Sequence, residues 1–241
     1  MQITWLGHAT VYIVTAGGTR ILVDAWVDNN PACPQEWHAQ LRAKGIDIIL
    51  LTHGHIDHSL DVAALHRDTG ARIVCQYDVT EWLTYQDINP DSIEAFNKGG
   101  TVRIGDVRIT MTTAQHSSNW PTAAGRRVLG NEVGYIIRAD DDHTVYAAGD
   151  TTVMADMAIL ADLYAPSIAL LPIGDRYTMG PYEAAYALKL LRSAYVLPIH
   201  HSTFPGLSGT PDQLKDEIAA RGVTCSVFAA IPGVSFHIGT K

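Results

Sequence analysis

Short apolar runs, separated by glycine or polar turns, alternate along the chain with stretches of helical periodicity. The run 47–52, Asp-Ile-Ile-Leu-Leu-Thr, is continuously apolar in its centre, as a buried strand would be. Runs rich in β-branched residues predict the strands of the first half, at 2–6, 10–15, 19–23, 47–52, 71–75, 101–104 and 107–112. Helices are expected over 60–68, ending before Gly70, and over 78–83.

The second half repeats this arrangement. Its strands are expected at 132–139, 143–147, 167–171, 195–198, 223–228 and 234–238. Its helices are expected within 154–163, over 180–191 and over 211–221. Two halves of this kind predict an α/β fold in which two mixed sheets pack face to face with helices outside. The segment 117–130 is the longest one without regular periodicity, and we expect a binding loop or a mobile loop there.

The length and the composition agree with one globular domain over 1–241. The chain has 241 residues, of which 47% are hydrophobic and 17% charged. Its formal net charge of −8 opposes binding to phosphate backbones, so we expect no nucleic-acid partner.

The cysteines and the apolar runs bear on location. Three dispersed cysteines without a C-x-x-C pair favour a reducing compartment over a disulfide framework. The first residues do not show the pattern of a signal peptide, and the longest apolar runs have the length of strands. We therefore expect a cytoplasmic protein without a membrane partner.

The segment Thr52-His53-Gly54-His55-Ile56-Asp57-His58 follows the buried strand directly and leads into a helix. In an extended chain His53 and His55 point the same way, so that two imidazoles can bind one metal ion. Asp57 and His58 then add a carboxylate and a third imidazole close by. Four such ligands within six residues suit two ions better than one tetrahedral ion. A merely solvated histidine-rich loop is the weaker interpretation.

Three later strands end in further candidate ligands. His116, Asp150 and His200 each lie just beyond a predicted strand, where ligand sites of α/β folds gather. An aspartate at the start of a helix is more often an N-cap. Asp150 is nevertheless a strong candidate ligand because it follows a strand in the same way as His116 and His200.

The sequence resembles the metallo-β-lactamase superfamily. It contains, in the order typical of that superfamily, the H-x-H-x-D-H run, a later His, an Asp in a Gly-Asp-Thr turn and a final His. The resemblance covers nearly the whole chain and implies the αββα four-layer sandwich. The segments 5–10, 22–26 and 172–180 resemble more closely a branch of stand-alone metal-dependent hydrolases related to L-ascorbate-6-phosphate lactonase. That branch also implies association into homo-oligomers.

The resemblance implies a ligand set for two divalent ions, with zinc favoured and manganese, iron or nickel as alternatives. His53, His55 and His116 would bind the first ion, and Asp57, His58 and His200 the second. Asp150 would bridge the two ions. His200 and His201 are adjacent in an extended segment, so only one of them should face the metals, and we choose His200.

Other residues are candidates for supporting roles. Asp57 is expected to orient a hydroxide generated between the metals and to take part in proton transfer. His8 is either a proton donor lining the pocket or a partner of a ligand, with a turn histidine as an equal alternative. Asp24 is expected to accept the second N–H of a ligand histidine. Asp175 and Thr178 line the pocket or, equally well, have capping or turn roles.

The remaining histidines are interpreted as surface residues: His38, His66, His143 and His237.

These features predict a hydrolase that cleaves an ester-type bond, in a lactone or a phosphodiester, of a small molecule. A nuclease or phosphodiesterase acting on RNA or nucleotides is the first alternative. A catalytically inactive metal-binding protein is the second, although its ligand set would be unusually complete. An electron-transfer role would need a partner domain, and cleavage of a membrane lipid would need an amphipathic basic helix that the sequence does not show.

Overall fold

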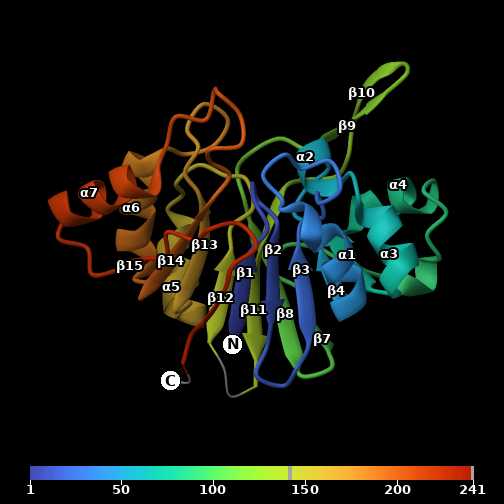
Figure 1. Cartoon of the computed structure of the whole chain (residues 1–241), viewed down its shortest axis with the longest axis horizontal. Helices are drawn as coiled ribbons and strands as arrows, with labels where there is room; N and C mark the ends of the chain where they lie inside the picture. The colour runs from blue at the N-terminus through green and yellow to red at the C-terminus, as the bar shows by residue number, and fades with distance from the viewer. Residues whose placement is uncertain (141–142, 240–241) are drawn as a thin grey trace.

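Two seven-stranded sheets lie face to face in the computed structural model, which describes residues 1–140 and 143–239 (Figure 1). In spatial order, the first sheet consists of β16 (Ser235–His237), β1 (Gln2–Trp5), β2 (Val11–Val14), β3 (Arg20–Val23), β4 (Ile48–Leu50), β5 (Arg72–Gln76) and β6 (Ile93–Phe96). The second consists of β15 (Ser226–Val227), β14 (Tyr195–Ile199), β13 (Ile168–Pro172), β12 (Thr144–Ala147), β11 (Val133–Ala139), β8 (Val107–Thr113) and β7 (Thr101–Ile104).

Each sheet is antiparallel on one side and parallel on the other. In the first sheet β16, β1, β2 and β3 pair antiparallel, whereas β3 to β6 pair parallel. In the second sheet β7, β8, β11 and β12 pair antiparallel, whereas β12 to β15 pair parallel. As a result β1, β3 and β4 run in one direction, as do β8, β12 and β14. Within each set, the carboxyl ends reach the same edge of the sheet.

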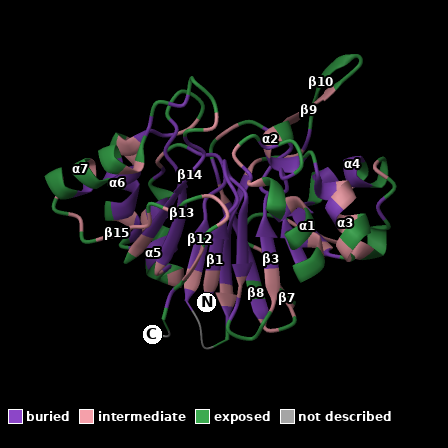
Figure 2. Cartoon of the chain, viewed as in Figure 1, coloured by how far each residue is buried: buried purple, intermediate pink, exposed green. Residues whose placement is uncertain are grey.

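The alternation of side chains along the strands separates three apolar clusters. Ile21 and Val23 of β3 belong to the core between the sheets, while Leu22 belongs to the cluster on the outer face. The helices α1 (Gln35–Lys44), α3 (Val62–Thr69) and α4 (Thr80–Thr84) contribute to that outer cluster. On the second sheet the helices α5 (Asp156–Tyr164), α6 (Pro181–Leu191) and α7 (Pro211–Ala220) do the same. The buried residues accordingly concentrate in the sheets and on the inner sides of the helices (Figure 2).

This arrangement confirms the predicted αββα fold. The remaining short elements are α2 (Ile56–Ser59) and the 3-10 turns at Tyr77–Val79 and Pro90–Ser92. None of the helices within 1–140 and 143–239 combines the length and the apolar character needed to cross a bilayer.

Several local expectations were wrong. The segment 117–130, expected as a binding loop or a mobile loop, contains a regular antiparallel hairpin of β9 (Asn119–Thr122) and β10 (Gly125–Val128), although part of it lines the pocket described below. The helix α1 and the strand β6 were missed, and the strand expected over 223–228 is limited to β15. Of the acidic turn that follows β11, residues 141–142 lie outside the described residues.

His143 is not a surface residue. Its side chain is buried, with Nδ1 2.9 Å from Ser167 Oγ and Nε2 2.6 Å from the carbonyl oxygen of Gly239. These polar partners allow a histidine in a polar context to be buried. His38 and His66 are half-buried, and His237 is exposed.

Candidate metal centre

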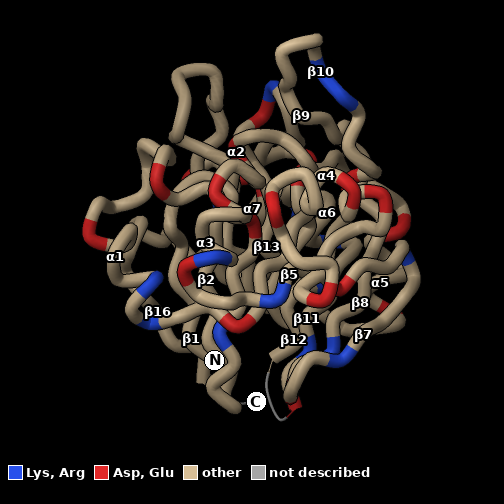
Figure 3. The backbone as a smooth tube through the Cα atoms, turned by 90° about the vertical axis from the view of Figure 1, so that its right-hand side faces the viewer, with Lys and Arg blue, Asp and Glu red and all other residues tan. Residues whose placement is uncertain are grey.

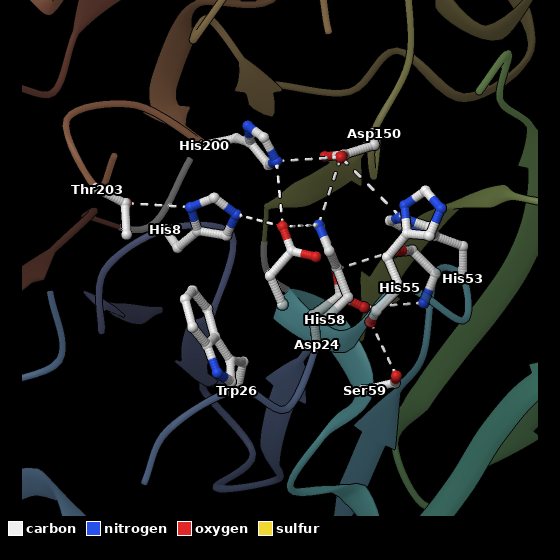
Figure 4. Close-up of polar contacts among 12 residues, drawn as sticks. His8, Asp24, Trp26, His53, His55, His58, Ser59, Asp150, His200 and Thr203 are labelled. Carbon is white, nitrogen blue, oxygen red and sulfur yellow. Dashed lines mark hydrogen bonds and ion pairs between the residues drawn. The ribbon is translucent and has the colours of Figure 1, made fainter. Parts of the chain in front are cut away.

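The candidate ligands lie at one edge of the two sheets, where strands of the same direction end. His53 and His55 follow β4, and α2 carries Asp57 and His58 immediately afterwards. The remaining ligands follow three strands of the second sheet: His116 after β8, Asp150 after β12 and His200 after β14. The topology thus gathers all seven predicted ligands from both sheets (Figure 4 draws most of them).

The first cluster consists of three imidazoles whose nitrogens converge. His55 Nδ1 lies 3.0 Å from His53 Nε2 and 3.3 Å from His116 Nε2. The opposite nitrogens have other partners, since His53 Nδ1 is 3.0 Å from Thr52 Oγ1 and His55 Nε2 is 3.0 Å from Asn119 Nδ2. Ligands about 2.0–2.1 Å from a tetrahedral ion would be separated by about 3.3 Å. The spacing of this cluster therefore fits one ion.

The second cluster combines a carboxylate with two imidazoles. Asp57 Oδ2 lies 3.8 Å from His58 Nε2 and 3.7 Å from His200 Nε2. Asp24 is fully buried behind this cluster, and its Oδ2 lies 2.6 Å from His58 Nδ1. Thr52 donates to both oxygens of Asp24, from its backbone N–H and from its hydroxyl, at 2.9 Å each. The carboxylate of Asp24 thus directs His58 Nε2 toward the site.

Asp150 lies between the two clusters. Its Oδ2 is 4.0 Å from His53 Nε2 and 3.5 Å from His116 Nε2, in the first cluster. It is also 3.4 Å from His58 Nε2 and 3.1 Å from His200 Nε2, in the second. Among the described residues, the buried atoms His58 Nε2 and Asp150 Oδ1 have no hydrogen-bond partner. Because a buried polar atom without a partner is costly, these atoms fit coordination by cations.

The protonation states of His53, His55 and Asp150 match this donor set, whereas His58 would have to release a proton to bind a metal ion. Burial lowers the pKa of His55 to about 4 and that of His53 well below its ordinary value. Both imidazoles are therefore neutral at neutral pH, which is the form that binds metals. Burial opposes ionisation of Asp150, but His200 and His58 outweigh it and hold the pKa of this carboxyl well below its usual range. Burial also disfavours the charged form of His58, yet Asp150, Asp24 and Asp57 raise its pKa well above the ordinary value.

His8 is fully buried behind Asp57. Its Nε2 lies 2.8 Å from Asp57 Oδ2, and its Nδ1 lies 3.0 Å from Thr203 Oγ1 (Figure 4). Burial lowers the pKa of His8 to about 4, although its hydrogen bond with Asp57 acts in the opposite direction. Both ring nitrogens of the neutral imidazole are thus engaged, one with a candidate ligand and one with a hydroxyl.

Three of these residues have the left-handed backbone conformation. His8, Asp24 and His200 have φ values of 52°, 52° and 54°, although none of them is glycine. Each lies directly beyond a strand or a turn that follows it. Residues with a Cβ adopt this conformation at a cost of about 1–2 kcal/mol, and such residues cluster at functional sites.

The other predicted site residues lie further from the ligands. His201 is buried and does not belong to the clusters of candidate ligands; its ring stacks on that of Trp5 at 4.9 Å between centroids. Asp175 is exposed and Thr178 half-buried, and neither belongs to the lining of the pocket described next. Asp175 instead accepts from the backbone N–H of Arg176, as its turn alternative implied.

A pocket of about 400 Å³ opens onto the ligands. Besides five of the ligands, it is lined by residues of α2, of the β9–β10 hairpin and of two loops of the second half: Ile56, Ser117, Asn119, Pro121, Arg126, Tyr177 and Phe204. Apart from the ligands, sequence reasoning missed these residues. Ile56 lies within the H-x-H-x-D-H run and Tyr177 within the segment 172–180, but neither was singled out as a pocket residue, and the signal for the hairpin residues was the unusual length of the segment 117–130.

The comparison with protein families agrees with the site. Residues 19–201 match the family described as the beta-lactamase superfamily domain. A UPF0173 metal-dependent hydrolase from Roseiflexus sp. (strain RS-1) is 48% identical over 233 residues, which cover 97% of this chain and 96% of the relative. A second one, from Chloroflexus aurantiacus, is 48% identical over 235 residues, covering 98% and 96%.

Solved structures show the same similarity. Igni18, a metallo hydrolase from the hyperthermophilic archaeon Ignicoccus hospitalis, superposes with a TM-score of 0.85 at 32% identity, over 99% of both chains. An isothiocyanate hydrolase from Delia radicum gut bacteria has a TM-score of 0.74 at 21% identity over all of both chains, which shows a shared fold. With the fold, the clustered His and Asp side chains and these relatives together, the chain belongs to the β-lactamase superfamily, as a metal-dependent hydrolase.

Proposed function

We propose that the chain hydrolyses an ester-type bond, in a lactone or a phosphodiester, of a small molecule, and that two zinc ions assist it. The main support for this proposal is the position of Asp150 Oδ2, which lies within 4.0 Å of imidazole nitrogens from both clusters. A carboxylate shared in this way supports two neighbouring ions bridged by Asp150. The same nitrogen and oxygen donors would also suit manganese, iron or nickel.

In this proposal each cluster holds one ion. Two divalent ions, held by these two clusters, would supply a water of lowered pKa near neutral pH and would polarise the bond under attack. The chain's own contribution is to fix the ligands before substrate binds. Asp24 and Thr52 hold His58, and the Thr52 hydroxyl, which donates to Asp24, accepts from His53 Nδ1.

Asp57 and His8 are the proposed residues for orientation and proton transfer. Asp57 lines the pocket, so its carboxylate can orient the attacking water and accept its proton. His8 does not line the pocket; its Nε2 lies 2.8 Å from Asp57 Oδ2, and its ring lies 4.0 Å from that of His200 between centroids. We therefore assign His8 a positioning role, in which its Nε2–H and the Thr203 hydroxyl keep the Asp57 carboxylate in place.

The pocket supports a small molecule as the substrate. A volume of about 400 Å³ is in the range of pockets for small ligands. The net charge of −8 is unfavourable for a long nucleic acid. Association into homo-oligomers and a cytoplasmic location stay predictions.

The test combines metal content with turnover. Metal content by mass spectrometry is measured for the wild type, for Asp57→Ala and for Asp212→Ala, which removes an exposed carboxylate of α7 as a control. The same proteins are assayed with bis-p-nitrophenyl phosphate, a panel of lactones and a single-stranded RNA. The proposal expects about two metals per wild-type chain and turnover of a small ester that Asp57→Ala loses and Asp212→Ala keeps.

Two results would contradict the proposal. Cleavage of RNA alone would favour the nuclease alternative. Two bound metals without turnover of any of these substrates would favour an inactive metal-binding protein.

A further inference from the structure

The β9–β10 hairpin extends beyond the body of the molecule beside the candidate metal centre (Figure 1). Its second strand carries adjacent arginines, visible as a basic segment in Figure 3. In the hairpin register Arg126 is opposite Pro121, and Arg127 is opposite Trp120. Successive side chains of a strand point to opposite faces, so the two arginines have different surroundings.

Arg127 already has partners on the outer face. Its Nη2 lies 2.9 Å from Glu81 Oε2, and its guanidinium lies 5.8 Å from the centroid of the Tyr85 ring. Trp120 packs on the same side, against Trp82 of α4, at 4.9 Å between ring centroids. This face therefore attaches the hairpin to α4, and the charge of Arg127 is compensated within the chain.

Arg126 lies on the inner face and lines the pocket over the ligands. Its Nη1 donates to Asn119 Oδ1 at 2.7 Å, and Asn119 Nδ2 lies 3.0 Å from His55 Nε2. No carboxylate of the described residues forms an ion pair with Arg126. The guanidinium is thus held close to the first cluster through one amide, while its other N–H groups face the pocket or solvent.

The rest of the lining combines one cation with aromatic rings. Among the described residues that line the pocket, Arg126 is the sole Lys or Arg. The two carboxylates of the lining, Asp57 and Asp150, are both proposed metal ligands. Tyr177 and Phe204, which are 58% and 41% exposed, contribute aromatic rings to the lining. The uncompensated cation can pair with an oxyanion, whereas the aromatic rings can contact an apolar group.

We propose that Arg126 is the specificity-determining residue of this site and binds a carboxylate or phosphate group of the substrate. The molecules hydrolysed here are then anionic esters or lactones with an apolar portion. This inference rests on the proposed function, because it names the substrate class of the same site. Arg127, the neighbour of equal charge, has no part in it.

The first experiment compares two esters that differ only in charge. The mono-p-nitrophenyl ester of succinate carries a free carboxylate, and its methyl ester is neutral. Arg126→Gln is expected to raise KM for the charged ester about 10- to 100-fold, since a hydrogen bond between charged groups is lost, and to leave KM for the neutral ester within about twofold. Arg127→Gln is the matched control and is expected to change neither value. An equal effect of Arg126→Gln on both esters, or no effect, overturns the inference.

A binding measurement separates this inference from the proposed function. Phenylphosphonate and benzoate are titrated by calorimetry into the metal-loaded wild type, Arg126→Gln and Arg127→Gln. Weaker binding of either anion in Arg126→Gln alone supports the anion site, and the more affected anion identifies the oxyanion. If the wild type hydrolyses no ester but this pattern holds, the proposed function fails and the anion site remains. Equal binding by the three proteins, or no binding by the wild type, overturns the inference.

Discussion

Asp24→Asn tests how the second cluster is held. Both oxygens of Asp24 are acceptors: Oδ1 from the backbone N–H of Thr52, and Oδ2 from the Thr52 hydroxyl and His58 Nδ1. An asparagine replaces one of these oxygens by an NH₂ group. In one orientation that NH₂ group faces the Thr52 N–H, so that two donors meet. In the other it opposes His58 Nδ1–H and favours the tautomer in which Nε2 carries the proton and cannot bind a metal.

The expected loss of metal affinity follows from the buried contact between Asp24 and His58. Changes to the partner of a metal-binding histidine typically weaken metal binding 10- to 100-fold, or about 1.4–2.7 kcal/mol. The weakening should mainly concern the ion proposed for the second cluster, because Asp24 reaches the first cluster only through the Thr52 hydroxyl, which lies 3.0 Å from His53 Nδ1. Metal binding is measured by competition with a chelator, and the metals retained per chain are counted by mass spectrometry.

The control is Asp61→Asn. Asp61 is also a buried carboxylate, and it accepts from the backbone N–H groups of Val27 and Asp28 at 2.6 and 2.9 Å, without touching an imidazole. Asp61→Asn should lower stability but leave metal affinity unchanged. The reasoning is refuted if Asp24→Asn binds both metals as tightly as the wild type, or if Asp61→Asn weakens metal binding equally.

Three further predictions concern stability. Gly54→Ala should cost about 1–3 kcal/mol by calorimetry, because its Cβ would lie 2.6–3.1 Å from atoms of the Leu129 side chain. The same substitution should cost less in a Leu129→Ala background, and an equal cost in both backgrounds would contradict the packing argument. Chelation of the metals should lower Tm, because ions that bind the folded state alone stabilise it, and an unchanged Tm would argue against structural coupling of the site. The Arg20 guanidinium holds the pKa of Asp47 below its ordinary value, so the pair stabilises the fold above about pH 3.9 and loses this effect as the pH falls further. In urea denaturation, Asp47→Asn should therefore be less stable than the wild type by about 0.5–1 kcal/mol at pH 7 and equally stable near pH 2, whereas the same difference at both pH values would contradict this assignment.

The clustering of the seven candidate ligands was predictable because signals in the sequence mark their positions. The run from His53 to His58 has a distinctive composition, and it follows an apolar strand. His116, Asp150 and His200 also follow strands, and strands of equal direction bring their carboxyl ends together. The contacts of Asp24 with Thr52 and His58 were predictable only in part. The sequence marks Asp24 as a residue at a strand end but does not identify His58 as its partner.

The hairpin was not predictable, because the signals that mark strands are weak in it. Its strands include Pro121 and two exposed arginines, and β10 is exposed throughout. What holds the hairpin is its own pairing and the contact of Trp120 with Trp82, which is distant in sequence. The helix α1 was missed for a similar reason, because it buries only Trp37 and Leu41 and its remaining residues are polar or small.

The pairing of β16 with β1 has a consequence for the order in which the chain folds during synthesis. All strands of the second sheet lie between residues 101 and 227, whereas the first sheet is completed only by residues 235–237. Until these residues leave the ribosome, β1 presents an unpaired edge that includes the core residues Ile3 and Trp5. An open apolar edge is a template for pairing with other chains. The interval between translation of β1 and of β16 is thus the period in which a chaperone would protect this protein most effectively.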